Sequence, residues 1–179
     1  WLADNGISGG WLEANGTYTF RGMSPVVRQD MAAFLYRLAD KAGKAGGVRP
    51  KTDFTDVTAK TPHYKDVEWL GGSGISQGYR NANGTWRFEG MTSVYRQDMA
   101  AFLKRLADKA GKTGGVTPKT NFTDVTDRTP HKAEIEWLGG SGISEGYRNA
   151  DGSWRFEGMT RVYRQDMAAF IHRLDNRLA

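Results

Sequence analysis

The stretch that decides the fold is WLGGSGIS at residues 69–76, because it recurs unchanged at residues 137–144. A looser copy, WLADNGIS, occupies residues 1–8. The copies begin at positions 1, 69 and 137, so each step along the chain covers 68 residues. Self-similarity at a fixed period is typical of repeat proteins, whose units bury an apolar face against their neighbours. The sequence therefore predicts three related units.

The repeats are expected at residues 1–43, 52–111 and 120–179. The second and third align without gaps and open with Phe-Thr-Asp-Val, at residues 54–57 and 122–125. The first repeat has no such opening. We therefore expect the chain to be a fragment from the C-terminal end of a larger protein, with another domain of that protein upstream.

Each full repeat predicts two helices separated by a turn-rich loop. In the second repeat, Thr61 and the proline after it predict the start of the first helix. Asn83-Gly84 predicts a tight turn in the loop, since both residues tolerate positive φ. Thr92 predicts the N-cap of the second helix, which should run to about Lys109. The apolar positions of this helix follow helical spacing: Met99, Phe102, Leu103 and Leu106.

The expected fold class is mainly α, with three helix-loop-helix repeats arranged as a pseudo-threefold trimer around a central helical bundle. One unit of two short helices buries too little apolar area to be stable alone. Three helices with equivalent apolar stripes can bury those stripes against one another. The sequence leaves open whether the first or the second helices of the repeats form that bundle.

The composition favours a binding protein with a polyanionic partner. The 179 residues include 25 Lys and Arg against 20 Asp and Glu, which gives a net charge of +5. These charges are interspersed without a basic tract, so nucleic acid is not an expected partner. No apolar run approaches the roughly 20 residues that cross a bilayer, so membrane insertion is not expected. No nucleophile–base motif or phosphate-cradling loop is present, and candidate residues occur in two or three copies, as binding sites do.

One repeat position always carries a cation near the start of the second helix: Arg28, Arg96 and Arg164. A helix N-terminus already carries partial positive charge, so free N–H groups and a guanidinium there predict an anion site. The aspartates two positions later are Asp30, Asp98 and Asp166. Alternatively, each arginine pairs with one of these acids or caps a carbonyl of a neighbouring repeat, and both roles can coexist. We expect Arg96→Ala and Arg164→Ala to weaken binding without unfolding the protein.

Two further repeat positions carry aromatic residues. The first set, Trp11, Tyr79 and Tyr147, lies on the loops, and at least its tyrosines are expected to line a sugar-binding groove. The second set is Tyr18, Trp86 and Trp154; its two tryptophans alternate with Phe88 and Phe156 and are expected in the core. His63 and His131 share a position but have no metal-ligand spacing, so neither a metal nor another cofactor is expected.

Several pieces of the second repeat follow one another in a distinctive order: residues 54–57, Trp69-Leu70, residues 74–79, residues 84–88 and residues 95–98. They read FTDV, WL, GISQGY, GTWRF and YRQD. Together, and nearly three times over, they resemble the S-layer homology (SLH) repeat of actinobacterial type. The resemblance covers the whole chain.

The resemblance implies a non-catalytic, secreted module of three repeats that holds a protein to secondary cell-wall polysaccharide. It places the arginine of the family's Thr-Arg-Ala-Glu motif on Arg28, Arg96 and Arg164, within the polymer groove, and the acid on Asp30, Asp98 and Asp166. The chain departs from that motif, because its threonine is replaced by Val27, Tyr95 or Tyr163 and its glutamate by aspartate. A pyruvylated polymer is therefore not implied.

The expected function is anchoring to the cell envelope by binding an anionic cell-wall polysaccharide, in an extracellular, cell-wall-associated location and without enzymatic activity. The alternative is a lectin-like or adhesive module that binds host glycans or a surface protein. A purely structural appendage that assembles the parent protein is a third possibility.

Overall fold

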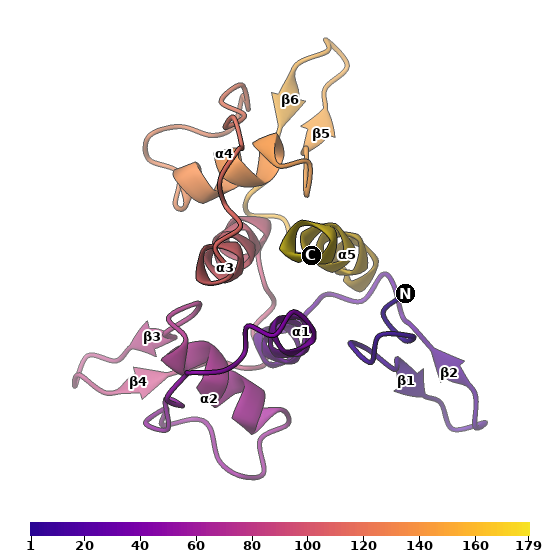
Figure 1. Cartoon of the computed structure of the whole chain (residues 1–179), viewed down its shortest axis with the longest axis vertical. Coiled ribbons are helices and arrows are strands. Elements are labelled where there is room, and N and C mark those ends of the chain that lie inside the picture. The colour runs from indigo at the N-terminus through magenta and orange to yellow at the C-terminus, as the bar shows by residue number, and fades with distance from the viewer.

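A computed structural model describes all residues from 1 to 179. Three long helices lie at the centre: α1 (Arg28–Lys41), α3 (Arg96–Lys109) and α5 (Arg164–Leu178). Each of them contacts the other two (Figure 1). Two shorter helices, α2 (Tyr64–Gly72) and α4 (Lys132–Gly140), pack on the outer sides of α1 and α3. The second helix of every repeat thus belongs to the central bundle, and the first helices lie outside it.

An antiparallel β-hairpin precedes each central helix. The strands are β1 (Trp11–Leu12) with β2 (Tyr18–Thr19), β3 (Tyr79–Arg80) with β4 (Trp86–Arg87), and β5 (Tyr147–Arg148) with β6 (Trp154–Arg155). The turn of the second hairpin contains Gly84 at φ 85°, as the Asn-Gly pair predicts. The hairpins project from the bundle and bring the aromatic positions of the loops next to the starts of the central helices.

The prediction of a mainly α fold is wrong. Helices cover 34% of the chain, and three two-stranded sheets accompany the five helices. The segments expected to be loops between helices pair as hairpins, while residues 43–63 and 111–131 run without regular helix. The first repeat has no outer helix, and its residues 2–6 form turns.

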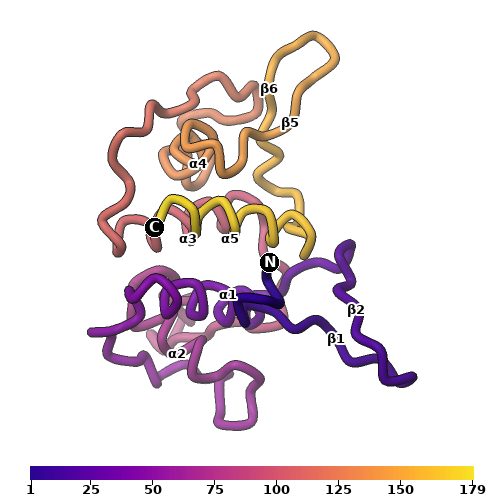
Figure 2. Tube along the Cα trace, turned by 45° about the vertical axis from the view of Figure 1, so that its right-hand side comes forward, coloured from indigo at the N-terminus to yellow at the C-terminus, as the bar shows by residue number.

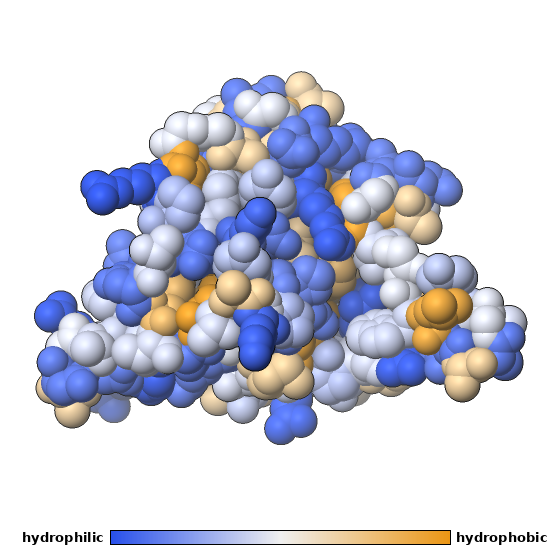
Figure 3. Space-filling model, turned by 90° about the horizontal axis from the view of Figure 1, so that it is seen from below, coloured by the Kyte–Doolittle hydropathy of each residue, from blue (hydrophilic) through white to orange (hydrophobic).

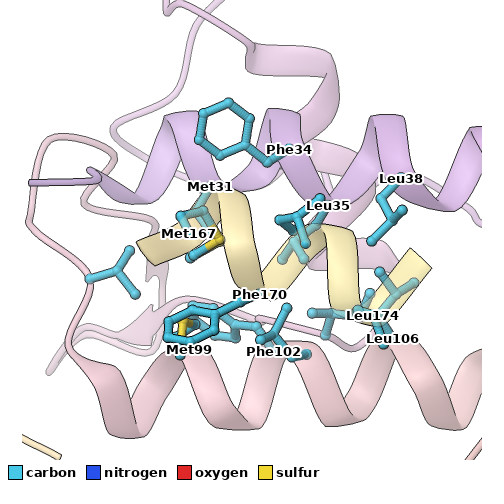
Figure 4. Close-up of a cluster of buried hydrophobic side chains, with 14 of the residues drawn as sticks. Met31, Phe34, Leu35, Leu38, Met99, Phe102, Leu106, Met167, Phe170 and Leu174 are labelled. Carbon is cyan, nitrogen blue, oxygen red and sulfur yellow. The ribbon is translucent and has the colours of Figure 1, made fainter. Parts of the chain in front are cut away.

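The core between the three central helices is built from equivalent side chains of the repeats. Figure 4 shows most of them gathered between α1, α3 and α5, with Phe34 turned away toward the outside of α1: Met31, Phe34, Leu35, Leu38, Met99, Phe102, Leu106, Met167, Phe170 and Leu174. All are at most 6% exposed. Complete burial of such a side chain contributes about 1.5–3 kcal/mol, so the shared core is the main reason that the repeats stay together.

A closed ring of backbone hydrogen bonds joins the three segments that lead into the central helices. Val26 N donates to Val162 O, Val162 N to Val94 O, and Val94 N to Val26 O, at 2.8–2.9 Å. Because residues of this segment pair across repeats, α3 begins at Arg96 and not near Thr92, where the sequence predicted it. Its predicted end is confirmed at Lys109.

The outer helices also begin later than predicted. α2 starts at Tyr64, after His63, which adopts a left-handed φ of 59°. Thr61, the predicted cap, instead accepts a hydrogen bond on its hydroxyl from Thr58 N at 3.0 Å and so closes a local turn. His131 before α4 repeats this backbone conformation with a φ of 61°.

The first and last parts of the chain meet at α5. Figure 2 shows the N-terminus beside this helix, and the rings of Trp1 and His172 lie 4.6 Å apart between centroids. The surface drawn in Figure 3 is mostly hydrophilic, with several small hydrophobic spots; one of them is at its right-hand end, the side on which the β1–β2 hairpin lies in Figure 1. None of the helices is long and apolar enough to span a membrane.

Candidate functional site: three grooves between repeats

Three grooves of similar build lie at the boundaries between repeats, with volumes of about 360, 450 and 370 Å³. Groove A contains Arg164, Trp11 and Asp30, groove B contains Arg28, Tyr79 and Asp98, and groove C contains Arg96, Tyr147 and Asp166. The nine residues that the sequence singled out thus lie in the grooves, three in each. Every groove takes its arginine from one repeat and its aromatic residue and aspartate from the next.

The arginine is held from two sides. In groove B, Arg28 Nε donates to the carbonyl of Phe88 at 2.8 Å, and its Nη2 donates to the hydroxyl of Ser76 at 3.2 Å. Only 5% of Arg28 is exposed. Arg96 and Arg164 repeat both contacts, with Phe156 and Ser144 in groove C and Phe20 and Ser8 in groove A. The prediction that the arginine caps a carbonyl of a neighbouring repeat is confirmed.

Aromatic rings enclose the guanidinium. The Cζ of Arg28 lies 4.8 Å from the ring centroid of Tyr79 and 4.7 Å from that of Phe88. In groove A, the Cζ of Arg164 lies 4.0 Å from the ring centroid of Trp11. These distances are within the range of cation–π attraction. Burial lowers the pKa of the Arg28 guanidinium, and nearby Tyr79 and Asp98 oppose that shift. The group nevertheless stays protonated, because the intrinsic pKa of arginine is so high.

One nitrogen of each of these guanidinium groups remains available to a ligand. The Nη1 of Arg28 makes no hydrogen bond within the protein, and neither does that of Arg96 or Arg164. No buried side-chain nitrogen or oxygen of the protein lacks a partner. Nη1 must therefore reach the solvent in the groove. Each groove therefore contains a positively charged hydrogen-bond donor, Nη1, on a guanidinium that the bonds of Nε and Nη2 hold in place.

The first two amides of each central helix are not free, contrary to the sequence-based expectation. Arg28 N donates to Thr92 O at 3.0 Å and Gln29 N to Gly90 O at 2.8 Å. The equivalent amides of α3 and α5 are paired in the same way with the next repeat. The pairing across repeats satisfies donors that an isolated helix would leave open.

The aspartates face the grooves without pairing with the buried arginines. No Arg–Asp ion pair forms there, so that alternative from the sequence is wrong for this structure. Instead, Asp98 lies 3.4 Å from His131 Nε2, and Asp30 lies 3.7 Å from His63 Nε2. The histidines come from the repeat that follows the aspartate, and groove C has no equivalent histidine.

A second arginine in each groove was missed by the sequence interpretation: Arg37, Arg105 and Arg173. Arg105 Nη1 donates to Ile75 O at 2.8 Å, and the other two make the equivalent bond. The available signal was their threefold recurrence nine positions after the first arginine. Groove C also contains Glu145, where groove B has Gln77. Groove C therefore sets two carboxylates against two guanidinium groups, whereas groove B has one carboxylate.

The second aromatic set lies away from the grooves. Trp86 and Trp154 are partly buried against the core, and lysine side chains cover them: Lys51 Nζ lies 4.4 Å from the ring centroid of Trp86, and Lys119 Nζ 3.3 Å from that of Trp154. Trp86 and Trp154 were expected in the core, but they lie at its edge and are only partly buried. Tyr18, the equivalent residue of the first repeat, is 70% exposed.

Comparisons with known proteins give no assignment. A scan against protein-family models found none that matches this chain, and a search of curated proteins found no match. No group of three or more His, Cys, Asp or Glu side chains is placed to hold a metal ion.

Proposed function

We propose that this protein is a non-catalytic, S-layer-homology-type module that anchors to the cell envelope by binding an anionic cell-wall polysaccharide in the three grooves. The observation that carries this proposal is the repeated pair of a buried arginine with a free Nη1 and an aromatic ring beside it. The location that follows is extracellular and cell-wall associated.

The chemistry of the groove suits an acidic sugar. A carboxylate or phosphate on the polymer accepts a charge-assisted hydrogen bond from Nη1, and the second arginine adds another positive charge. The ring of Trp11, Tyr79 or Tyr147 offers an apolar face to the sugar. The groove volumes of 360–450 Å³ lie in the lower part of the range found for small-ligand sites.

The threefold repetition favours a polymer over a small free ligand. A polysaccharide presents many copies of its acidic group, so two or three grooves engage one chain together. Linked weak sites reach an overall affinity far above that of each site. Exposed charge contacts are screened by salt, so binding should weaken as ionic strength rises.

The test is co-sedimentation of the chain with purified Gram-positive cell-wall sacculi, before and after hydrofluoric acid removes the acid-labile secondary polymers. The proposal requires binding that is lost on extraction. A folded protein that binds neither preparation would overturn it and favour a host-glycan or protein partner, which a glycan array then examines.

A matched pair of variants separates groove binding from bulk charge. The groove variant replaces the second arginines with glutamine: Arg37→Gln, Arg105→Gln and Arg173→Gln. The control variant replaces three exposed arginines that make no side-chain contact in the grooves: Arg49→Gln, Arg128→Gln and Arg161→Gln. Both lose the same charge. We expect a loss of at least about tenfold in binding for the groove variant only, because three linked sites weaken together. If both variants lost the same amount of binding affinity, the interaction would be nonspecific electrostatic attraction and not groove binding.

A further inference from the structure

The outer face of α5 lacks the helix that covers its two counterparts. α2 packs on α1 and α4 packs on α3, whereas α5 contacts no helix other than α1 and α3 (Figure 1). Ala32, Ala33, Ala100 and Ala101 are at most 1% exposed, but the equivalent Ala168 and Ala169 are only half-buried. These two alanines line an apolar pocket of about 550 Å³.

The other two repeats show what occupies the equivalent place. The ring of Phe54 is 4% exposed and lies 5.5 Å from the ring of Phe88, and Phe122 meets Phe156 edge to face at the same distance. Phe88 and Phe156 are thereby at most 1% exposed. Phe20, their counterpart in the first repeat, has no such partner and is 36% exposed.

A carboxylate completes the same arrangement in the full repeats. The two oxygens of Asp56 accept hydrogen bonds from Phe88 N at 2.8 Å and Glu89 N at 2.7 Å, and Asp124 does the same in the third repeat. No carboxylate meets the equivalent amides of Phe20 and Arg21. The residue that follows Phe20 is a cation, where the full repeats have Glu89 and Glu157. The side chain of Arg21 is itself paired with Glu13, at 3.0 Å between Nη2 and Oε1, so the two backbone amides are the donors left for an incoming acid.

We propose that this pocket on α5 binds an extended Phe-Thr-Asp segment followed by the first turn of an amphipathic helix, like residues 49–68 and 117–136. The phenylalanine packs on Phe20, and the aspartate accepts hydrogen bonds from the amides of Phe20 and Arg21. The helix then covers Ala168 and Ala169, as the fully buried Val67 and its neighbours cover α1. This inference does not depend on the polysaccharide proposal.

Ala3 should determine how closely the phenylalanine of the bound segment can approach the first repeat. In the full repeats Gly71 and Gly139 let the ring approach closely, since a Cβ on either would lie 2.9 Å from it. Ala3 stands at this position in the first repeat and lines the pocket. The bound ring therefore lies slightly farther out, and Ala3→Gly should tighten the complex.

The experiment titrates the 179-residue chain into a fluorescent peptide with the sequence of residues 49–68 and follows the anisotropy. We expect saturable one-to-one binding and a higher Tm of the chain with peptide. The Phe54→Ala and Asp56→Asn peptides should each bind at least about tenfold more weakly, because they remove the buried ring or the charged acceptor. Equal affinities of the three peptides, or no binding of the parent peptide, would overturn the proposal.

Two variants of the chain make the test specific to this pocket. Ala169→Arg places a long charged side chain in the pocket and should abolish binding, whereas Ala3→Gly should strengthen it. A melting curve confirms that each variant is folded. If neither variant shifts the affinity, the peptide binds elsewhere and the assignment is wrong. A dimer of the chain that excess peptide fails to dissociate would show that a second copy occupies this face, which also contradicts the proposal.

Discussion

At the scale of single residues, the arginine of each groove is both a structural and a ligand-facing group. Arg96 is 3% exposed, donates to Phe156 O and Ser144 Oγ, and leaves only Nη1 to the groove. The structure argues against the expectation that Arg96→Ala weakens binding without affecting the fold. Removal of the side chain leaves a buried carbonyl without its donor and opens a cavity between the rings.

The first prediction concerns the stability of that variant. Arg96→Ala should lower the free energy of unfolding by about 2–4 kcal/mol, since it combines an unsatisfied buried acceptor with lost packing. Urea denaturation followed by tryptophan fluorescence measures the change. The control, Arg161→Ala on the surface, should stay within about 0.5 kcal/mol of the parent. A loss for Arg96→Ala as small as that of the control would show that the arginine contributes nothing to the fold.

The second prediction uses the charge difference between two grooves. Glu145→Gln in groove C should strengthen binding of acidic wall-polysaccharide fragments, and Gln77→Glu in groove B should weaken it. Both side chains are exposed, so an effect of about two- to fivefold is expected in calorimetric titrations. The two substitutions are reciprocal, so changes of the same sign would contradict the assignment of the grooves as anion sites.

The repeated sequence pattern was enough to predict which arginines, aspartates and aromatic residues belong to the candidate site. It did not predict which of them share a groove. Arg28 lies with Asp98 and not with Asp30, because each groove forms where one repeat meets the next. Arg105 was missed for another reason. In the sequence it resembles the neighbouring Lys104, since both are basic residues of the same helix. Only the structure shows that Arg105, and not Lys104, donates a hydrogen bond to the carbonyl of Ile75.

At the scale of elements, glycines fix how close the linkers come to the outer helices. Gly140 ends α4, and a Cβ built on it collides with the carbonyl of Thr117. The contact is with backbone, which cannot move aside as a side chain can. Gly72 at the end of α2 has the same relation to the carbonyl of Arg49.

The third prediction follows from that contact. Gly140→Ala should lower the Tm clearly, by an amount equivalent to about 1–3 kcal/mol, although alanine favours helices in general. Gly114→Ala is the control, since its Cβ would meet nothing within 4 Å and its φ is not positive. Differential scanning calorimetry compares the two. Stabilisation by Gly140→Ala would show that the linker does not lie against α4.

The helices were easier to predict than the strands. The apolar spacing of Met99, Phe102 and Leu106 extends over several turns, which suffices to identify α3. The strands are two residues long, too short for an alternating pattern to stand out from a loop. The true helix starts escaped prediction because cross-repeat hydrogen bonds, which no local signal reports, take up the residues before them.

At the scale of the whole molecule, the three repeats share one core and fold as one unit. Leu35, Leu103 and Ile171 are equivalent and all 0% exposed. The buried hydrophobic side chains of all three repeats form one continuous cluster. Unfolding should therefore be cooperative across all repeats.

The fourth prediction tests this cooperativity. Leu103→Ala in the second repeat should lower the free energy of unfolding by about 2–5 kcal/mol. Amide hydrogen exchange should show the loss in α1 and α5 as much as in α3. Protection that drops in α3 alone would mean that the repeats unfold independently.

The ring formed by Val26, Val94 and Val162 has a consequence for how such a protein can change over evolutionary time. The unit that was duplicated in the gene is not the unit that holds a ligand, since every repeat gives its arginine to one groove and its aromatic residue to another. A substitution at one groove residue therefore changes a single groove, and only the part of it that this repeat contributes. Gain or loss of a whole repeat would break the circle and disturb two grooves at once. Selection should therefore keep the number of repeats at three. Single substitutions can still change the specificity of one groove at a time, from either of the two repeats that form it.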